Sequence, residues 1–485
     1  MRFSGVDYNG LMPFRIRLFF GTCFALALWG AFWPGWGWLG WLAPALLFLS
    51  LDGIGPGRGA LLGGVFGLFF FLIELSPTLS LWPFLGSLSI PAWLLLSLYG
   101  TVFFALLGGV VGWRSSPLLW AGAWALLEAA RGAGPLGFSF GTLPGALMGQ
   151  PFLAAAAWGG ATLLSLGMAW TSACLAARRR WALLSLLGPG LLSLLAALAP
   201  PPAPEGELAF SLVQPNIEQV EKLDRGNLQA LLGRYESLLS SISGQVDLVV
   251  LPENVLPAYL RAEPELLTPF LDTAGRLSAR LLVGTGELRA GKVYNSVLLI
   301  SPSRKIAGVY DMVHLVPFGE YLPGRKLWEA LGLGPLLDRL LPMDLTPGEG
   351  PRPLGELGVM ICFETQFSSL SRALTAQGAE VLIALTNDAW FGRTRLLWEH
   401  FALGALRAAE CGRSFLQAAQ TGITGAVGPQ GELLAQLPPW EAGVLTVKVP
   451  LACHETPWVK TGPWPSLGLA GLLFLVGLRK RRPRR

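Results

Sequence analysis

Eight apolar runs dominate the hydrophobic pattern of this chain. Each run is long enough, or nearly long enough, to cross a bilayer as a helix. The runs lie at about residues 18–32, 36–51, 60–79, 91–111, 115–130, 152–174, 181–199 and 464–478. The first two runs are short, and the fifth contains Glu128. The segments between the runs are therefore needed to test the count.

The basic residues between these runs support eight crossings. If the N-terminus is cytoplasmic, the cytoplasmic segments carry nearly all of the basic residues, as the positive-inside tendency requires. These residues are Arg15, Arg17, Arg58, Arg114, Arg178 to Arg180 and the tail from Arg479 to Arg485. The short segments on the other side carry only Arg131. Seven or nine crossings would place the tail on the wrong side.

The same count predicts the domain organisation. We expect residues 1–200 to form a transmembrane domain of about seven helices, and residues 464–478 to form a C-terminal transmembrane helix. Residues 479–485 then form a basic cytoplasmic tail. Residues 205–455 form an extracytoplasmic domain, which follows a proline-rich joint at residues 200–204.

Strand and helix patterns alternate in the extracytoplasmic part. Predicted strands lie at residues 208–214, 247–251, 281–286, 293–300, 309–312, 358–362, 381–385, 414–418 and 444–449. Predicted helices lie at residues 227–243, 265–280, 368–377 and 395–410. Apolar strands that alternate with amphipathic helices indicate a buried sheet covered by helices. The apolar, Pro/Gly-rich segment at 321–351 is too long for a simple connection, so we expect either a lid or a packed surface arm.

Composition agrees with this division and argues against several functions. Only 14% of the residues are charged and 52% are hydrophobic, whereas soluble domains carry about 25% charged residues. The net charge of +5 comes from clusters at the ends of apolar runs, so nucleic acid binding is not expected. The five cysteines form no CxxC pair, which supports neither a disulfide framework nor a zinc site. No signal-peptide cleavage site is visible, so we expect the first run to stay as an anchor.

Two charged residues near the end of the fifth run have two interpretations. Glu128 and Arg131 are three positions apart and share one face if the helix continues. A charge inside a membrane run is a functional candidate, but near a helix end it fits an interfacial pair equally well. The Gly/Pro-rich segment 132–150 has too polar a backbone to lie in lipid, so we expect it at the outer interface.

Candidate chemistry lies at the ends of three predicted strands. Open α/β sheets place reactive groups at the carboxyl ends of their strands. Cys362 follows one apolar strand and lies two residues before Glu364. Glu253 lies at the end of a second strand, and Glu320 ends the segment 310–320 that continues a third strand. A thiol beside a carboxylate that can act as its base is a candidate nucleophile. Each residue taken singly could be structural, but three converging strand ends favour a catalytic site.

Five sequence blocks resemble the nitrilase superfamily of carbon–nitrogen hydrolases. The blocks are LPE ending at Glu253, HLVPFGEYLP at 314–323, ICFE around Cys362, TNDAWFG at 386–392 and EHFALGALRAAECGRSFLQAAQTGIT at 399–424. The apolar N-terminal body, the single C-terminal span and the spelling HLVPFGE make the chain similar to the apolipoprotein N-acyltransferase family.

This resemblance implies a nitrilase-like α-β-β-α sandwich attached to the membrane helices, with a Glu-Lys-Cys triad. The family moves an acyl chain from a phospholipid onto its cysteine as a thioester, and then to the amino group of the diacylglyceryl-cysteine of an apolipoprotein. The resemblance places the protein in the bacterial cytoplasmic (inner) membrane with its catalytic domain on the periplasmic side. We expect a monomer without a cofactor or a metal.

The positions that match the family's motifs are expected to have the same roles as in the family. Cys362 would be the nucleophile and Glu253 the base, while Glu320 and Glu364 would orient and polarise. The expected substrate-binding residues are Tyr321, Trp390 and Phe391. The last two fit core packing equally well. We expect His400 to belong to a structural hydrogen-bond network.

The triad lysine is missing from its expected position. The family's tyrosine-x-lysine-x-histidine block reads Tyr310-Asp-Met312-Val-His314 here, and the flanking match leaves no gap to shift it. A thioether has no charge, and the loss of one oxyanion donor typically costs about 10²–10³ in rate. Arg304 and Lys305 precede the strand, but their spacing gives no reason to expect them in the site.

Three hypotheses follow from this departure. The chain is a working or slowed N-acyltransferase, a homologue that binds lipid or lipoprotein but turns over poorly, or a membrane-tethered amidase that uses the same thiol. We expect Met312→Lys to raise the rate of thioester formation. An unchanged or lower rate would mean that another residue supplies the positive charge or that the match at this block is wrong.

Overall fold

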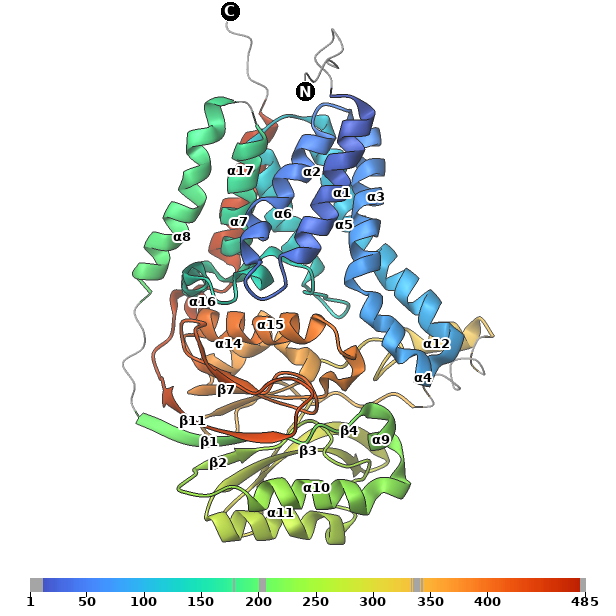
Figure 1. The fold of residues 1–485 in the computed structure, drawn as a ribbon, viewed down its shortest axis with the longest axis vertical. Helices are drawn as coiled ribbons and strands as arrows, with labels where there is room; N and C mark the ends of the chain where they lie inside the picture. Colours follow the sequence, from blue (N-terminus) through green and yellow to red (C-terminus); the bar gives the residue numbers. More distant parts are fainter. Residues whose placement is uncertain are drawn as a thin grey trace, which may run out of the picture.

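The computed structural model describes residues 12–479 except residues 178, 200–205, 333, 335–340 and 342. A helical bundle is stacked on an α/β domain, and the two remain in contact (Figure 1). The main helices of the bundle are α1 (Phe14–Gly30), α2 (Ala43–Leu51), α3 (Pro56–Glu74), α5 (Ser89–Trp113), α6 (Pro117–Arg131), α7 (Ala156–Ala176), α8 (Leu187–Ala197) and α17 (Trp464–Leu478). One of these helices therefore lies in each predicted apolar run.

The lengths of these helices support a membrane body. Within the described residues, three helical segments are long and apolar enough to cross a membrane, namely Pro56–Glu74, Ser76–Trp113 and Pro151–Ala176. Three shorter apolar helices lie at Gly37–Leu51, Trp181–Ala197 and Trp464–Leu478. The count of eight crossings stays a prediction. The proline-rich joint and most of the basic tail lie outside the described residues.

Small residues let two of the membrane helices approach closely. Gly59 and Gly63 of α3 face Gly108 and Gly112 of α5, and a Cβ atom on any of the four would overlap backbone atoms of the opposite helix. Such small-residue contacts allow van der Waals packing between helices where lipid removes the hydrophobic driving force. These glycines therefore hold α3 and α5 together.

Polar contacts gather several helix ends at the end of the bundle that lies away from the α/β domain. The Arg17 guanidinium, near the start of α1, donates to the carbonyl oxygens of Ser50 and Asp52 at the end of α2. The Arg114 guanidinium, just after α5, donates to the Leu478 oxygen at the end of α17 at 2.6 Å. These contacts bring the expected cytoplasmic segments to one face.

Two sheets form the centre of the α/β domain. The six-stranded sheet has the order β11-β1-β2-β3-β4-β5, and the five-stranded sheet has the order β10-β9-β8-β7-β6. The first sheet contains β1 (Gly206–Gln214), β2 (Leu248–Val250), β3 (Arg280–Arg289), β4 (Lys292–Ile300), β5 (Ile306–Asp311) and β11 (Gly443–Leu451). The second contains β6 (Leu357–Ile361), β7 (Val381–Thr386), β8 (Ser414–Ala419), β9 (Gly425–Val427) and β10 (Leu433–Gln436).

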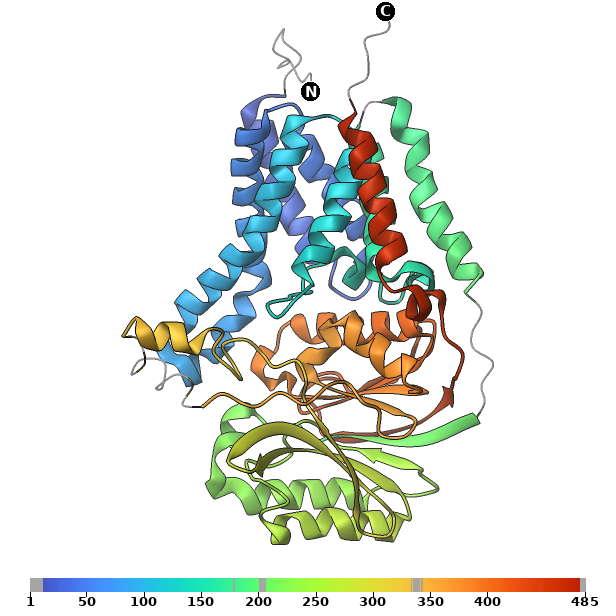
Figure 2. The same ribbon diagram turned by 180° about the vertical axis from the view of Figure 1, so that it is seen from behind.

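The two sheets pack face to face and helices cover their outer faces (Figure 2). Leu212 and Val250 of the first sheet share one buried cluster with Val359 and Ile383 of the second. Helices α10 (Leu228–Ser240) and α11 (Pro264–Leu277) pack against the first sheet. Helices α14 (Ser368–Ala376) and α15 (Leu396–Cys411) cover the second sheet and share a cluster with the bundle. The layers therefore follow the expected α-β-β-α order.

The hydrophobic pattern predicted every long element of this domain but missed two strands. β9 and β10 have three and four residues. These lengths are too short for apolar and polar positions to show a readable alternation. Both strands pair at the edge of the five-stranded sheet, where neighbouring strands rather than local sequence determine their conformation.

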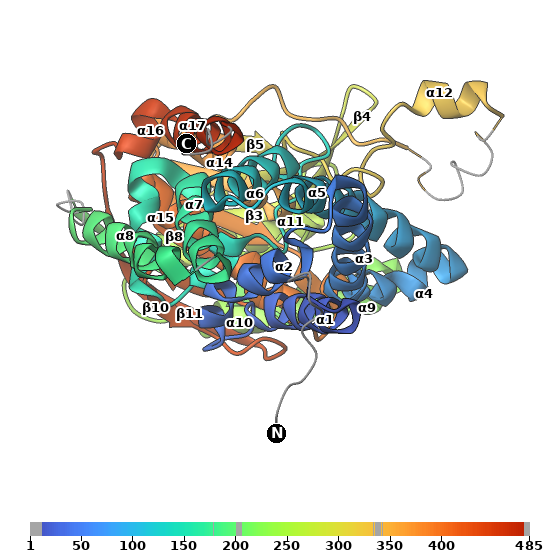
Figure 3. The same cartoon turned by 90° about the horizontal axis from the view of Figure 1, so that it is seen from above.

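The predicted lid segment is only partly described. Its helix α12 (Arg325–Ala330) projects from the molecule, and α4 (Trp82–Leu85) projects to the same side but apart from it (Figure 3). Leu327 and Leu331 are each 62% exposed, which does not fit a packed surface arm. Exposed leucines suit contact with lipid, so the role as a lid stays a prediction.

A candidate thiol site beneath the helical bundle

Cys362 occupies the turn between β6 and the short helix η8 (Cys362–Gln366). Its backbone has a φ of 44°, a left-handed conformation that is strained for residues other than glycine. The residue is half-buried. Burial and the neighbouring carboxylate of Glu253 raise the pKa of the Cys362 thiol well above its usual value. The thiol therefore keeps its proton until a base removes it.

Glu253 follows β2 and supplies a buried carboxylate near this thiol. Its Oε1 accepts a hydrogen bond of 2.7 Å from Asn295 Nδ2. Its Oε2 is buried, and the Cys362 side chain forms a hydrogen bond with the carboxyl. Burial raises the pKa of the Glu253 carboxyl, although the charge of Lys222 opposes this shift. A buried carboxylate with a raised pKa beside a thiol is suited to accept the proton of that thiol.

Asn295 links Glu253 to Glu320. Its amide nitrogen also donates to Glu320 Oε1 at 2.9 Å, and Glu320 Oε2 accepts from the Val316 backbone nitrogen at 2.8 Å. Burial and the neighbouring Glu253 raise the pKa of Glu320 to about 7. Glu320 therefore binds the same amide as the Glu253 carboxylate, and its expected orienting role stays a prediction. Sequence reasoning missed Asn295, whose only signal is a polar side chain within the apolar strand β4.

Met312 lies at the position that the resemblance predicts for the lysine. Its side chain is 1% exposed, and its Sδ lies 3.6 Å from Asn295 Nδ2. The thioether therefore sits beside the amide that bridges the two carboxylates. Neither Arg304 nor Lys305 replaces the missing charge. Arg304 pairs with Asp272 on the surface, and Lys305 is exposed.

Lys222 brings an ammonium group into this site. The residue belongs to the short helix α9 (Gln219–Leu223), is 3% exposed, and donates from Nζ to the Glu253 backbone oxygen at 3.0 Å. Burial lowers the pKa of Lys222 to about 8, while Glu253 and Cys362 oppose this shift. Sequence reasoning missed this residue because the charged run around it is typical of a solvated helix face.

Asn387 connects Lys222 to the thiol. In the orientation that gives both amide atoms partners, the side-chain oxygen of Asn387 lies 3.3 Å from Lys222 Nζ and 3.2 Å from the Trp390 indole nitrogen. The Asn387 backbone N–H donates to the Cys362 sulfur and lowers the pKa of the thiol. The surroundings of the thiol thus contain the carboxylates of Glu253, Asp388 and Glu320, the ammonium group of Lys222 and one backbone donor.

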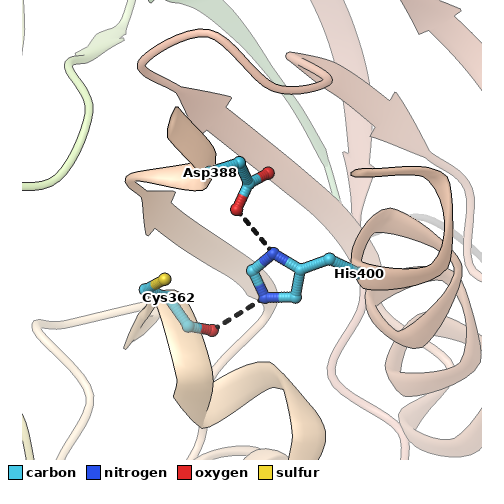
Figure 4. A group of neighbouring side chains, drawn as sticks. All are labelled: Cys362, Asp388 and His400. Atoms are coloured by element: carbon cyan, nitrogen blue, oxygen red, sulfur yellow. Dashed lines mark hydrogen bonds and ion pairs between the residues drawn. The ribbon is translucent and has the colours of Figure 1, made fainter. Parts of the chain in front are cut away.

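His400 holds the backbone of the nucleophile rather than its sulfur (Figure 4). Its Nδ1 lies 2.7 Å from Asp388 Oδ1, and its Nε2 lies 3.1 Å from the Cys362 carbonyl oxygen and 2.7 Å from Thr365 Oγ1. Burial lowers the pKa of His400, but the charge and hydrogen bond of Asp388 raise it overall.

The potential ligand atoms of Cys362, Asp388 and His400 lie within 4.8 Å of one another, a geometry that could also suit a metal ion. Both ring nitrogens of His400 already have partners, so a metal ion would have to break one of these contacts. The predicted structural network of His400 is therefore present in the geometry.

Glu364 fixes the strand end that carries Cys362. Its carboxylate accepts hydrogen bonds from the backbone nitrogens of Ile361 at 2.8 Å, Val313 at 2.7 Å and His314 at 3.1 Å. The Tyr310 hydroxyl donates to the same carboxylate at 3.0 Å. Burial raises the pKa of Glu364 to about 7. The residue ties the end of β5 to the end of β6, which agrees with the expected orienting role.

Replacing Glu364 by glutamine is expected to destabilise the protein. An amide offers one acceptor oxygen in place of two, so buried N–H donors would face its NH₂ group, at a cost of about 1–3 kcal/mol for each unsatisfied group. The thermal midpoint in detergent should fall clearly. The matched control is Glu356→Gln, which removes a half-exposed ion pair with Arg280 and should cost about 1 kcal/mol or less. Equal shifts in the two variants would contradict this role.

The predicted substrate residues lie between the site and the bundle. The Trp390 carbonyl oxygen accepts a hydrogen bond of 2.6 Å from Ser80 in η2 (Ser76–Leu81), and its ring lies 5.1 Å from that of Phe84. The Phe391 ring lies 5.9 Å from that of His400. Both residues are half-buried, as is Tyr321. Their contact with substrate stays a prediction.

A cavity of about 890 Å³ lies between the bundle and the α/β domain. Residues from both parts line it, including Glu128 and Thr162 of the bundle and His314, Tyr321 and Phe367 of the domain. Cys362 is not among the lining residues, but Phe367 directly follows η8. The cavity therefore reaches the residue after η8, and Cys362 itself does not line it.

Glu128 and Arg131 bind the loop between α6 and η4 (Leu143–Leu147). Glu128 Oε1 accepts from the Leu143 backbone nitrogen at 2.9 Å, and Arg131 donates to the Phe140 oxygen at 2.6 Å. No ion pair between these two side chains occurs in the described part of the chain. Loop backbone binds both charges, and the Ser165 hydroxyl also donates to Glu128 Oε2. The choice between a functional role and an interfacial pair stays open.

Comparisons with known proteins cover both parts of the chain. Residues 211–455 match the family model described as carbon-nitrogen hydrolase, and residues 22–174 match that described as apolipoprotein N-acyltransferase N-terminal domain. A protein named apolipoprotein N-acyltransferase from Haemophilus ducreyi is 32% identical over 289 residues, which cover 56% of this chain and 55% of that protein. The chain thus spans about half the length of this relative.

A second relative is similar over a larger part of the chain. A protein with the same name from Azotobacter vinelandii is 32% identical over 393 residues, which cover 76% of this chain and 74% of that protein. A solved carbon-nitrogen hydrolase from Helicobacter pylori G27 is 17% identical and covers 57% of this chain and 96% of its own. Its TM-score is 0.39.

Proposed function

Because the chain belongs to the apolipoprotein N-acyltransferase family, we propose that it transfers an acyl chain from a phospholipid to an apolipoprotein through a thioester on Cys362. The acceptor is the N-terminal amino group of a diacylglyceryl-cysteine. The observation that carries this proposal is a protonated thiol close to the buried carboxylate of Glu253, on the side of the α/β domain that meets the bundle.

The first half-reaction loads the cysteine. Glu253 takes the thiol proton, and the thiolate of Cys362 attacks the carbonyl carbon of the phospholipid ester. The bond between this carbon and the glycerol oxygen then breaks, and Glu253 returns the proton to the leaving oxygen. The products are a thioester and a lysophospholipid. Splitting the transfer in this way means that the two bulky lipids need not be bound together.

The second half-reaction releases the acyl chain. The neutral amino group of the diacylglyceryl-cysteine attacks the thioester carbon, and a carbon–nitrogen bond forms as the carbon–sulfur bond breaks. Glu253 accepts the proton from the attacking nitrogen and returns it to the sulfur, which restores the thiol. Glu320 and Glu364 take part as positioning residues, through Asn295 and the strand ends respectively.

The membrane arrangement follows from the same proposal. Both substrates are anchored in a bilayer, so the site must face the membrane. Eight crossings would place the start of α1 and the end of α17 on the cytoplasmic side of the inner membrane, and the α/β domain on the periplasmic side. The contacts of Arg17 and Arg114 support this arrangement, because they gather basic helix ends at the face away from the thiol. We propose a monomer that needs no cofactor.

The test of this function is the formation of a thioester. After incubation with phospholipid in detergent or vesicles, the purified protein should carry an acyl group that hydroxylamine removes. Cys362→Ala should carry none, whereas Cys453→Ala, which removes an exposed cysteine, should behave like the parent. Absence of the thioester in the parent would contradict the proposal. Release of free acid from a small amide without lipid would instead favour an amidase.

A further inference from the structure

The site contains a lysine although the expected position holds methionine. Lysine is almost never fully buried unless its charge is paired. Among the lysines that the structure describes, Lys222 alone is buried, and its ammonium group lies at the tip of the strand that presents Glu253. A buried ammonium group costs free energy unless carboxylates or carbonyl oxygens compensate it. Its location beside the base therefore calls for a functional explanation.

We propose that Lys222 supplies the positive charge for the reaction at Cys362, in place of the lysine that Met312 replaces. This inference rests on the thiol chemistry proposed above. An ammonium group has three N–H donors. The Glu253 backbone oxygen accepts one at 3.0 Å, and the Asn387 side-chain oxygen lies 3.3 Å from Nζ. The third donor is left for the oxygen that becomes negative when the thiolate attacks.

Asn387 links the ammonium group of Lys222 to the sulfur of Cys362. Its side chain contacts Lys222, while its backbone N–H donates to the Cys362 sulfur. The ammonium group and the nucleophile are thus held by the same residue. Preorganised donors of this kind stabilise developing charge without a reorganisation cost at the moment of reaction.

The charge of Lys222 also acts on the base and the thiol. The nearby ammonium group lowers the pKa of Glu253 against the effect of burial, and Lys222 interacts electrostatically with Cys362. Because burial lowers the pKa of Lys222 only to about 8, most of the group is protonated at pH 7. Met312 cannot do the same, because a thioether has neither a charge nor a donor.

The test compares Lys222→Met, Met312→Lys and the double variant Lys222→Met/Met312→Lys with the parent. Lys222→Met should slow thioester formation by about 10²–10³, the typical loss for one oxyanion donor. The double variant should regain at least about tenfold of this loss. Met312→Lys alone should change the rate much less, because the parent already has its cation. Lys448→Met, which removes an exposed lysine on β11, should match the parent.

A rate for Lys222→Met within about threefold of the parent would overturn the inference. An equal effect of Met312→Lys in both backgrounds would also overturn it, because independent sites give additive effects. Thermal unfolding in detergent checks that the variants fold. If Lys222→Met does not fold, Lys222→Gln gives the same comparison, since it keeps a donor for the Glu253 oxygen but has no charge.

A second measurement needs no lipid. The rate at which iodoacetamide alkylates Cys362 reports the thiolate fraction at each pH, with Cys362→Ala as the blank. In Lys222→Met, loss of the cation should move the midpoint of this alkylation profile to higher pH. If Lys222 had a purely structural role, the variant would change only the temperature of thermal unfolding. An unmoved midpoint would overturn the inference. If Lys222→Met shifts this midpoint but the parent forms no thioester, Lys222 still acts as the cation beside the Cys362 thiol. The proposed acyl transfer is then rejected.

Discussion

Replacing Glu253 by glutamine is expected to slow thioester formation on Cys362 by about 10²–10⁴-fold, the usual contribution of a general base. Glutamine keeps the size of the side chain and can still accept the hydrogen bond from Asn295 Nδ2. It cannot take a proton. Because burial raises the pKa of the Cys362 thiol, few thiolates form without a base, and the variant should be nearly inactive in single-turnover labelling with phospholipid.

The pH dependence of the same reaction identifies the base. Only ionised Glu253 accepts a proton, so the rate of the parent should rise as the pH rises through the raised pKa of this carboxyl and should fall below it. Glu253→Gln should lose this limb, and its residual rate should rise only as the thiol itself ionises at higher pH. An unchanged acidic limb in Glu253→Gln would assign the base elsewhere. Glu263→Gln, which alters an ion pair with the partly exposed Arg225, serves as the control.

Replacing Arg395 by alanine is expected to cause the largest loss of stability. Arg395 precedes α15 and forms ion pairs with Glu74 of the bundle and with Glu399 of α15, the latter at 3.3 Å. All three side chains are almost fully buried. Removing the cation leaves two carboxylates without their partner, and breaking a buried pair in this way typically costs about 3–5 kcal/mol.

The measurement is thermal unfolding in detergent, with Arg393→Ala as the matched control. Arg393 is exposed and lies over the Trp440 ring, 5.0 Å from its centroid. Its removal should cost about 1 kcal/mol or less. Adding Glu74→Gln and Glu399→Gln to Arg395→Ala removes both unpaired carboxylates. This triple variant should recover part of the stability that Arg395→Ala loses. Similar midpoints for Arg395→Ala and Arg393→Ala would show that this contact does not hold the two parts together.

This contact matters for the site because α15 connects the bundle to the nucleophile. Arg395 and Glu399 bind Glu74 and the Gly141 backbone on the bundle side. One residue further along the same helix, His400 binds the Cys362 carbonyl oxygen. The strained turn at Cys362 is therefore held by a helix whose position depends on the membrane part. The α/β domain and the bundle form one working unit.

Periodicity along the chain was sufficient to predict the long helices and strands and the division into a membrane body and an α/β domain. Long apolar runs and alternating strands and helices are local properties, so each predicted element of the α/β domain is present. The short strands β9 and β10 were missed because pairing with neighbours determines them. The family resemblance supplied the sandwich, which the pattern of elements alone left as one of several α/β arrangements.

The candidate site shows the same division. Cys362 and Glu253 were found because both follow apolar strands, and the carboxyl ends of parallel strands gather reactive groups. Asn295 could not be recognised, because only the pairing of β4 with β3 and β5 turns its amide toward two carboxylates. Lys222 was missed for a related reason. Nothing in a charged run shows that one of its side chains is buried.

The sequence by itself determined the membrane and α/β parts, the positions of the thiol and of the carboxylate proposed as its base, and the absence of a lysine at residue 312. Those features depend on residue type and on spacing along the chain. Only the tertiary structure showed that an ammonium group lies at this site, since Lys222 reaches the Glu253 backbone oxygen across 31 residues of sequence. Burial and electrostatic pairing depend on distance in space, and that distance exists only once the sheets and helices have packed.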